Sequence, residues 1–287
     1  MRVELNGLEF HVEIDGAGPP LLLLHGFTGS TGAWDDLRAQ LSPGTRVIAL
    51  DLIGHGESAA PPDPSRYTLE WCARDLLALL DWLHLEQVNV LGYSMGGRVA
   101  LHFAVMAPQR VNTLILESAS PGIEDPTERI RRVENDDALA QHIVDRGIDA
   151  FVEEWEQVPL LALQPHVPAK VRDRQHALRL RNDPLGLANS LRGMGAGQQQ
   201  PLWSRLGGLD VPVQLIVGEC DTRYVAAARR MATMLPFVEL AVVPAAGHTV
   251  HLDQPEPFGG FVTQALTSRL KIASRRQTSH CQQIDTL

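Results

Sequence analysis

A serine stands at the tip of a pattern that can create a reactive nucleophile or base. Residues 88–101 read VNVLGYSMGGRVAL, so a G-x-S-x-G motif centred on Ser94 lies between an apolar run and a helical pattern. In that context the motif predicts a sharp strand–turn–helix that presents the serine hydroxyl outward. Such a hydroxyl becomes reactive when a histidine accepts its proton and a carboxylate orients that histidine.

The partners of this serine are expected in the order acid and then histidine along the chain. Asp221 follows the apolar run VQLIVGE, and His248 lies in AAGHTVHLDQ after the run VELAVVP. His251 is the alternative histidine. Asp125 and Asp136 are alternative acids, although both lie in a helical segment rather than at a strand end. We predict a hydrogen-bonded chain from the serine through His248 to Asp221.

Negative charge that develops on a substrate oxygen requires backbone N–H donors. Met95, at the start of the helix after the serine, is expected to supply one donor. Phe27, in the segment LLLLHGFTGS, is expected to supply the other. We interpret His25 in the same segment as a structural histidine that is bonded to the backbone.

Arg98 is an unexpected residue because it lies in an otherwise apolar helical stretch. It follows Ser94 by four positions, so both residues lie on one side of the first helical turn. An unpaired guanidinium is costly to bury. Two interpretations follow: Arg98 pairs with an acid such as Glu117 and fixes the helix, or it faces a pocket and binds a substrate carboxylate.

Strand-like and helical segments alternate along the chain and must position these residues. Near-continuous apolar strand runs with helical patterns between them, notably 69–85 and 95–107, predict an α/β fold. The sheet should be mostly parallel, with helices on both faces. The first two strands, joined by DGAGPP, are expected to be antiparallel. The strand-like runs are 10–14, 21–26, 47–51, 88–93, 113–118, 213–219 and 238–244.

The alternation stops between residues 119 and 210, where helical charge patterns replace strands. This stretch is too long for a loop, so we predict a helical cap over a core formed by 1–118 and 211–270. The polar segment 271–287 lacks periodicity and is expected to be a disordered tail.

Two arginine clusters lie in the predicted cap. If each cluster contributes one side chain to a pocket that also contains Arg98, that pocket suits a substrate with several carboxylates, because guanidinium groups bind carboxylates bidentately. The sequence does not decide which member of each cluster faces the pocket. The clusters are Arg129, Arg131 and Arg132, and then Arg179 and Arg181.

The composition excludes several other classes of protein. A net charge of −9 argues against a general nucleic-acid binder. No run reaches the roughly 18 apolar residues of a membrane span, and the N-terminal segment lacks a signal core. Three widely spaced cysteines, Cys72, Cys220 and Cys281, fit a reducing cytoplasm, and no metal-ligand spacing is present. We therefore expect a cytoplasmic protein without metal or cofactor, acting on a small polycarboxylate; its oligomeric state stays open.

Several motifs carry a resemblance to known proteins. LLLLHGFTGS, DLIGHGES, GYSMGG and AAGHTVHLDQPE resemble those of the α/β-hydrolase superfamily over residues 1–270. GYSMGGRVAL, LESASPGI, the ERIRRVENDD segment, LRNDPLGLANSLRGMGAGQQQPLW and GHTVHLDQPEPF are more specific. They resemble the 2-succinyl-6-hydroxy-2,4-cyclohexadiene-1-carboxylate synthases, which are lyases of menaquinone and phylloquinone biosynthesis.

The resemblance implies an α/β-hydrolase fold with a cap and a pyruvate-eliminating reaction. The implied substrate is 2-succinyl-5-enolpyruvyl-6-hydroxy-3-cyclohexene-1-carboxylate, which loses a ring proton and then pyruvate. A serine hydrolase of an ester or a carbon–carbon bond in an anionic substrate is the alternative. Ile53 departs from the family pattern, which usually has proline there, and Thr222 and Arg223 follow the acid where the family often has a lysine. The implied site residues are Ser94, Asp221 and His248 for catalysis, and Arg98, Arg132, Arg181, Tyr93 and Trp155 for substrate binding.

Overall fold

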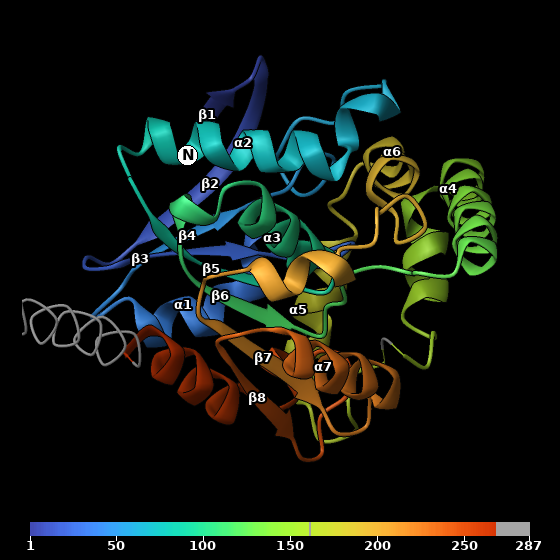
Figure 1. Cartoon of the computed structure of the whole chain (residues 1–287). Helices are drawn as coiled ribbons and strands as arrows, with labels where there is room; N and C mark the ends of the chain where they lie inside the picture. The colour runs from blue at the N-terminus through green and yellow to red at the C-terminus, as the bar shows by residue number, and fades with distance from the viewer. Residues whose placement is uncertain (161, 268–287) are drawn as a thin grey trace, which may run out of the picture.

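The computed structural model describes residues 1–160 and 162–267, and a single sheet forms the centre of this part (Figure 1). Within it the eight strands lie in the order β1-β2-β4-β3-β5-β6-β7-β8. All neighbours from β4 to β8 are parallel, whereas β1–β2 and β2–β4 are antiparallel. The strands are β1 (Arg2–Leu5), β2 (Leu8–Asp15), β3 (Pro20–Leu24), β4 (Arg46–Leu50), β5 (Val88–Tyr93), β6 (Val111–Glu117), β7 (Val213–Gly218) and β8 (Val238–Val243).

The central strands are continuous apolar runs because both of their faces are covered. In β3, Leu22 and Leu24 belong to one hydrophobic core, and Leu21 and Leu23 belong to the other. Helices α2, α3 and α7 cover the first face, while α1 and the helical residues 255–267 cover the second. The alternation of strands and helices therefore produces the predicted α/β architecture with helices on both faces.

Helices α2 and α3 follow the predicted helical ranges 69–85 and 95–107 closely. Within the insertion, Gly147, with a φ of 77°, interrupts α4. The helices are α1 (Asp35–Leu41), α2 (Leu69–Trp82), α3 (Met95–Met106), α4 (Pro126–Trp155), α5 (Ala169–Arg179), α6 (Pro184–Met194), α7 (Thr222–Met234) and α8 (Val250–Asp253), with short 3₁₀ turns η1 (Thr31–Trp34), η2 (Pro64–Tyr67), η3 (Pro108–Arg110) and η4 (Trp203–Gly208).

The first two predicted strands, β2 and β3, are not neighbours in the sheet, contrary to expectation. β2 is indeed antiparallel to the strands after it, but β4 lies between β2 and β3: Val12 pairs with Leu50 and Leu22 pairs with Ile48. The connection between β2 and β3 crosses the loop before β4 at close range. At Gly16, a Cβ atom would lie 2.2 Å from the carbonyl oxygen of Ser42, so a side chain does not fit there.

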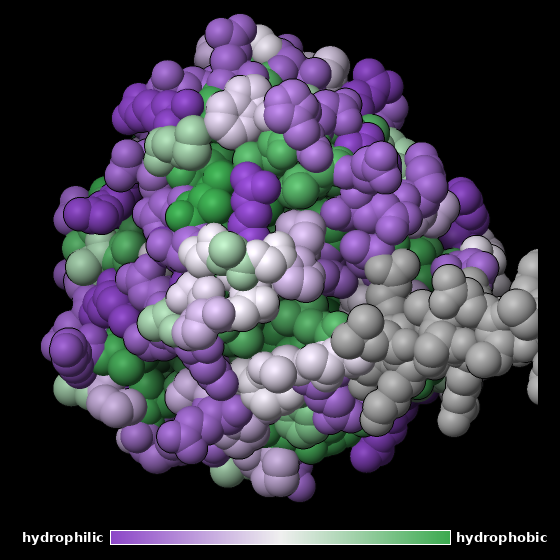
Figure 2. Space-filling view, turned by 90° about the vertical axis from the view of Figure 1, so that its left-hand side faces the viewer, coloured by the Kyte–Doolittle hydropathy of each residue, from purple (hydrophilic) through white to green (hydrophobic). Residues whose placement is uncertain are grey.

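Residues 119–210, as far as they are described, form helices and turns without a strand. Figure 1 shows α4 and α6 side by side at one side of the sheet. On the opposite side, Figure 2 shows hydrophobic patches broken up by hydrophilic side chains. No helix in the described ranges is long and apolar enough to cross a membrane. The tail prediction for 271–287 falls outside the described residues.

Candidate active site

Ser94 occupies a strained turn between β5 and α3. Its φ of 49° and ψ of −105° are unfavourable for a residue with a side chain. Two backbone hydrogen bonds hold this conformation: the Ser94 N–H donates to the carbonyl of Glu117, and the Arg98 N–H donates to the carbonyl of Ser94. The strand and the helix thus fix the serine hydroxyl at the carboxyl edge of the sheet.

The glycines of the motif are required by close packing. A Cβ atom on Gly92 would lie 2.3 Å from the carbonyl oxygen of Gly96. A Cβ atom on Gly96 would lie 2.2 Å from the carbonyl oxygen of Leu24. These approaches are too short for any side chain, so the motif lets α3 start directly against β5 and β3.

His248 connects the serine to Asp221. Its Nε2 lies 2.9 Å from the Oγ of Ser94, and its Nδ1 lies 2.7 Å from an Oδ of Asp221. An ionised carboxylate can only accept, so Nδ1 carries a proton and Nε2 is free to accept the serine proton. Asp221 and His248 are 4% and 3% exposed, and the second Asp221 oxygen accepts from the N–H of Tyr224.

The alternative partners lie elsewhere. His251 is buried against Trp34 and bonds to the carboxylate of Glu117. Asp125 caps the start of α4. Asp136 accepts from Arg132. The structure therefore brings His248 and Asp221, rather than these residues, to the serine.

The loop after β3 lies beside the serine and is fixed by a buried histidine. His25 Nδ1 donates to the carbonyl of Gly26, and its Nε2 accepts from the N–H of Leu52. Burial lowers the pKa of His25 to about 4, so it is neutral near pH 7. Phe27, two residues later, and Met95, the first residue of α3, both line the cavity next to Ser94. The N–H of Met95 has no partner within its own helix, as expected at a helix start.

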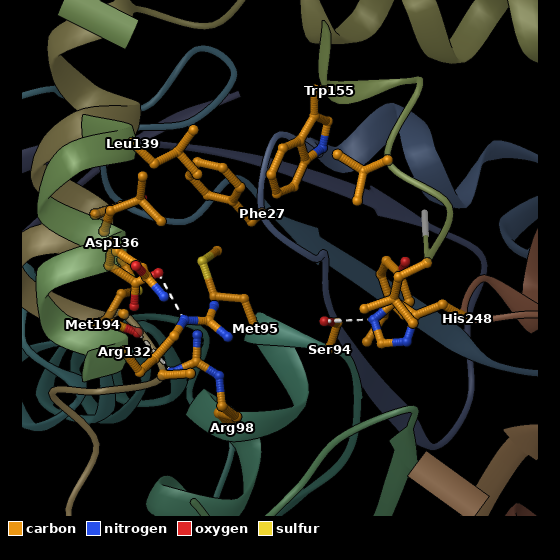
Figure 3. Close-up of a pocket in the computed structure, with 18 of the residues that line it drawn as sticks. Phe27, Ser94, Met95, Arg98, Arg132, Asp136, Leu139, Trp155, Met194 and His248 are labelled. Atoms are coloured by element: carbon orange, nitrogen blue, oxygen red, sulfur yellow. Dashed lines mark hydrogen bonds and ion pairs between the residues drawn. The ribbon is translucent and has the colours of Figure 1, made fainter. Parts of the chain in front are cut away.

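A cavity of about 340 Å³ lies between this edge of the sheet and the helical insertion. Figure 3 shows Ser94 and His248 on one side and Arg98 and Arg132 on the other, with Met95 between them. The volume is in the range of small-ligand sites. Across residues 1–160 and 162–267, no cluster of His, Cys, Asp or Glu could hold a metal ion.

Arg98 faces this cavity and has no carboxylate partner in the described part of the chain. Its Nη1 donates to the carbonyl of Met194 at the end of α6, over 2.6 Å. Glu117, the partner considered from the sequence, is bonded to His251, so the predicted pairing of Arg98 with Glu117 is wrong. Burial lowers the pKa of Arg98 to about 10, which leaves it charged at neutral pH.

The insertion supplies Arg132 to this cavity and Arg179 to a smaller neighbouring cavity, and the two cavities share Phe27, Tyr93 and Trp155. Arg132 lines the cavity, and its Nε donates to Asp136 over 2.8 Å, which leaves both terminal nitrogens available. The prediction for Arg181 is wrong, because this side chain is exposed and does not line the cavity. α5 ends at Arg179, so the chain leaves the helical periodicity before Arg181. Arg179 turns inward instead and bonds to Glu156.

Arg223 is a cavity residue that the sequence analysis recorded only as a departure from the family pattern. It lines the same cavity as Arg98 and Arg132, and it has no ion-pair partner among the described residues. Its place is set by α7, which begins directly after Asp221. The available signal was therefore a cation two residues after the acid, at the start of a helix.

Aromatic side chains complete the cavity. Trp155 lines it and packs edge-on against Phe27, with ring centroids 5.3 Å apart. Tyr93 also lines it and shares a hydrogen bond with Thr249, while burial raises the pKa of its hydroxyl. The hydroxyl of Tyr93 is therefore neutral near pH 7, and both residues predicted as pocket contacts border the cavity.

The sheet order, the serine turn and the position of the histidine define a class of protein. Residues 19–255 match the family model described as the alpha/beta hydrolase fold, so the chain belongs to that fold family. A Bacillus subtilis protein with a provisional assignment as 2-succinyl-6-hydroxy-2,4-cyclohexadiene-1-carboxylate synthase is 44% identical over 265 residues, which cover 92% of this chain and 96% of that protein.

Two further comparisons identify the family to which the chain belongs within this fold. The 2-succinyl-6-hydroxy-2,4-cyclohexadiene-1-carboxylate synthase of Enterobacter sp. strain 638 is 31% identical, over 88% of this chain and 93% of that protein. The solved structure of MenH from S. aureus superposes with a TM-score of 0.87 at 32% identity, covering 91% of this chain and 99% of that one. The chain is therefore a member of the 2-succinyl-6-hydroxy-2,4-cyclohexadiene-1-carboxylate synthase family.

Proposed function

We propose that this protein is a carbon–oxygen lyase that eliminates pyruvate from 2-succinyl-5-enolpyruvyl-6-hydroxy-3-cyclohexene-1-carboxylate. The other product is 2-succinyl-6-hydroxy-2,4-cyclohexadiene-1-carboxylate. Family membership supports this reaction. The observation that carries the proposal is the cavity itself, in which Arg98 has no carboxylate partner from residues 1–160 and 162–267 and lies opposite a serine that is bonded to histidine.

The first step uses the serine as a base. The ring carbon that bears the succinyl carbonyl has an acidic proton, because the charge left behind spreads onto the carbonyl oxygen. Ser94 takes this proton while its own proton passes to Nε2 of His248, and the carboxylate of Asp221 stabilises the resulting imidazolium. Positioned proton transfer of this kind contributes roughly 100- to 10,000-fold to a rate.

The second step expels pyruvate. We assign the stabilisation of the charge on the succinyl oxygen to the backbone N–H groups of Phe27 and Met95, two residues that line the cavity. The electrons then move through the ring double bond, and the bond between the ring and the enolpyruvyl oxygen breaks. The proton held by His248 is available to the departing enolate, which becomes pyruvate. Neither a water molecule nor an acyl-enzyme is required.

The arginines account for the charge of the substrate. It carries three carboxylates, and the cavity presents three arginines, namely Arg98, Arg132 and Arg223. Among the described residues, Nε and Nη2 of Arg98 and the two terminal nitrogens of Arg132 have no partner, so each arginine can bind a carboxylate bidentately. We propose that Arg223 takes the binding role expected of Arg181, while Trp155 and Tyr93 border the ring.

The alternative function is hydrolysis of an ester or a carbon–carbon bond, since the same serine, histidine and N–H groups can form an acyl-enzyme. Incubation with the enolpyruvyl substrate distinguishes the two. The lyase releases pyruvate and the ring diene in equal amounts, and Ser94→Ala abolishes both. Steady hydrolysis of nitrophenyl acetate far above the Ser94→Ala control, without diene from the enolpyruvyl substrate, would instead support the hydrolase.

A further inference from the structure

Asp136 is a buried acid in a cavity that otherwise suits anions. It lies on α4, is 4% exposed, and lines the same cavity as Arg98 and Arg132 (Figure 3). Its Oδ1 accepts from Nε of Arg132 over 2.8 Å. Its Oδ2 is buried and has no hydrogen-bond partner in the described residues.

A role in positioning Arg132 accounts for only one of the two carboxylate oxygens of Asp136. The contact joins one oxygen to one nitrogen, whereas a side-on pair between guanidinium and carboxylate would use both oxygens. A buried acceptor without a donor costs about 1–3 kcal/mol, and more when it is charged. Asp136 also adds negative charge to a cavity that suits anions. Its Oδ2 therefore destabilises the free protein, where it has no donor, and repels the carboxylates of the ligand.

The described part of the chain offers no donor on the side of Oδ2 that faces α6. Gly195 follows α6 directly, and a Cβ atom there would lie 2.6 Å from Oδ2. The N–H of Gly195 is already bonded to the carbonyl of Leu191. The carbonyl of Met194 accepts from Arg98. Gly195 therefore packs directly against Oδ2, which only a residue without a Cβ allows, and the neighbouring backbone groups are occupied or are acceptors themselves.

We propose that Oδ2 of Asp136 is the subsite for the ring hydroxyl of the substrate, an inference that rests on the proposed function. At neutral pH the three carboxylates, the ketone and the enol ether of the substrate can only accept hydrogen bonds. The hydroxyl is its single donor; Asp136 lines the cavity, and its Oδ2 is a buried carboxylate acceptor without a partner among the described residues. Asp136 thereby fixes the orientation of the ring and selects hydroxylated anions.

Two inhibitors that differ in the hydroxyl test this subsite. The first is the ring-diene product. The second is 2-succinylbenzoate, the aromatic compound that forms when this product loses its hydroxyl as water, with both carboxylates retained. Inhibition constants are measured against the enolpyruvyl substrate for the unaltered protein, Asp136→Ala and Asp136→Asn. The control is Asn135→Ala, a neighbouring polar residue that also lines the cavity.

The ratio of the two constants isolates the hydroxyl, because any displacement of Arg132 weakens both inhibitors alike. We expect the unaltered protein to prefer the hydroxylated inhibitor. This preference should fall about tenfold or more in Asp136→Ala, less in Asp136→Asn, and not in Asn135→Ala. The isosteric Asp136→Asn supplies the comparison if Asp136→Ala does not fold.

An unchanged ratio in both Asp136 variants, or the absence of a preference in the unaltered protein, would overturn the hydroxyl subsite. Equal weakening of both inhibitors would assign Asp136 to the positioning of Arg132 alone. Failure of the proposed function is a separate result, because the unaltered protein would then release no pyruvate from the enolpyruvyl substrate.

Discussion

Replacing Arg98 separates carboxylate recognition from fold stability. Arg98→Lys keeps a positive charge in the cavity but removes the planar fork that Nε and Nη2 present. Arg98→Met removes the charge as well and keeps a similar length. Both changes remove the bond from Nη1 to the carbonyl of Met194, so the two variants share this structural loss.

The size of the effect follows from the contacts. A hydrogen bond to a charged group is worth about 1.5–3 kcal/mol. Lysine can retain one of two such bonds to the substrate, so Arg98→Lys should lower kcat/KM roughly 10- to 100-fold. Arg98→Met loses both bonds and the charge and should lose more. Stability should change by no more than about 1 kcal/mol in Arg98→Met, because the lost bond to Met194 is offset by relief of the burial that lowers the pKa of Arg98 to about 10. Arg98→Lys keeps a buried charge and should be no more stable than Arg98→Met.

The assay is pyruvate release from the enolpyruvyl substrate at neutral pH, with unfolding in urea measured on the same preparations. The expected result is a large loss of kcat/KM in both variants, with a nearly unchanged unfolding midpoint in Arg98→Met. Undiminished turnover in both variants would refute the anchoring role of Arg98. A large loss of stability with equal effects on all substrates would show that Arg98 mainly ties α3 to α6.

Other changes test other parts of the site and the fold. Arg223→Ala should lower kcat/KM about tenfold, whereas Arg181→Ala, at an exposed position, should leave it within about twofold. Burial lowers the pKa of His25 from 6.5 to about 4, so only the unfolded chain binds this proton between those pH values. This part of the stability is present above pH 6.5 and should fall by about 1.4 kcal/mol per pH unit toward pH 4. In His25→Asn, the free energy of unfolding, measured by chemical denaturation at each pH, should depend less steeply on pH. Gly96→Ala places a Cβ atom 2.2 Å from a backbone oxygen and should cost more than about 3 kcal/mol in an unfolding titration, while Gly44→Ala, with open space around it, should cost little.

Local patterns predicted the central strands because these runs carry their own signal of burial on both faces. The turn at Ser94 was equally visible, since a Cβ atom at Gly92 or Gly96 would collide with backbone. Strand neighbours depend on contacts distant in sequence, so the sequence did not show that β4 lies between β2 and β3.

The arginines show which side-chain positions the local sequence pattern does not determine. Arg132 follows a regular helical period and reaches the cavity, but Arg181 lies beyond the end of α5, where the period no longer determines direction. Arg223 reaches the cavity because Asp221 caps α7 and sets the direction of its first turn. The competition between Arg98 and His251 for Glu117 required tertiary packing to resolve.

The most direct test of the central claim, proton abstraction by Ser94, is a single-turnover reaction with substrate deuterated at the ring carbon that bears the succinyl group. The mass of the intact protein is followed at the same time points. We predict a primary deuterium isotope effect on diene formation, with Ser94 unmodified throughout. A covalent adduct on Ser94 that forms and decays at the rate of turnover, without an isotope effect, would contradict the elimination mechanism.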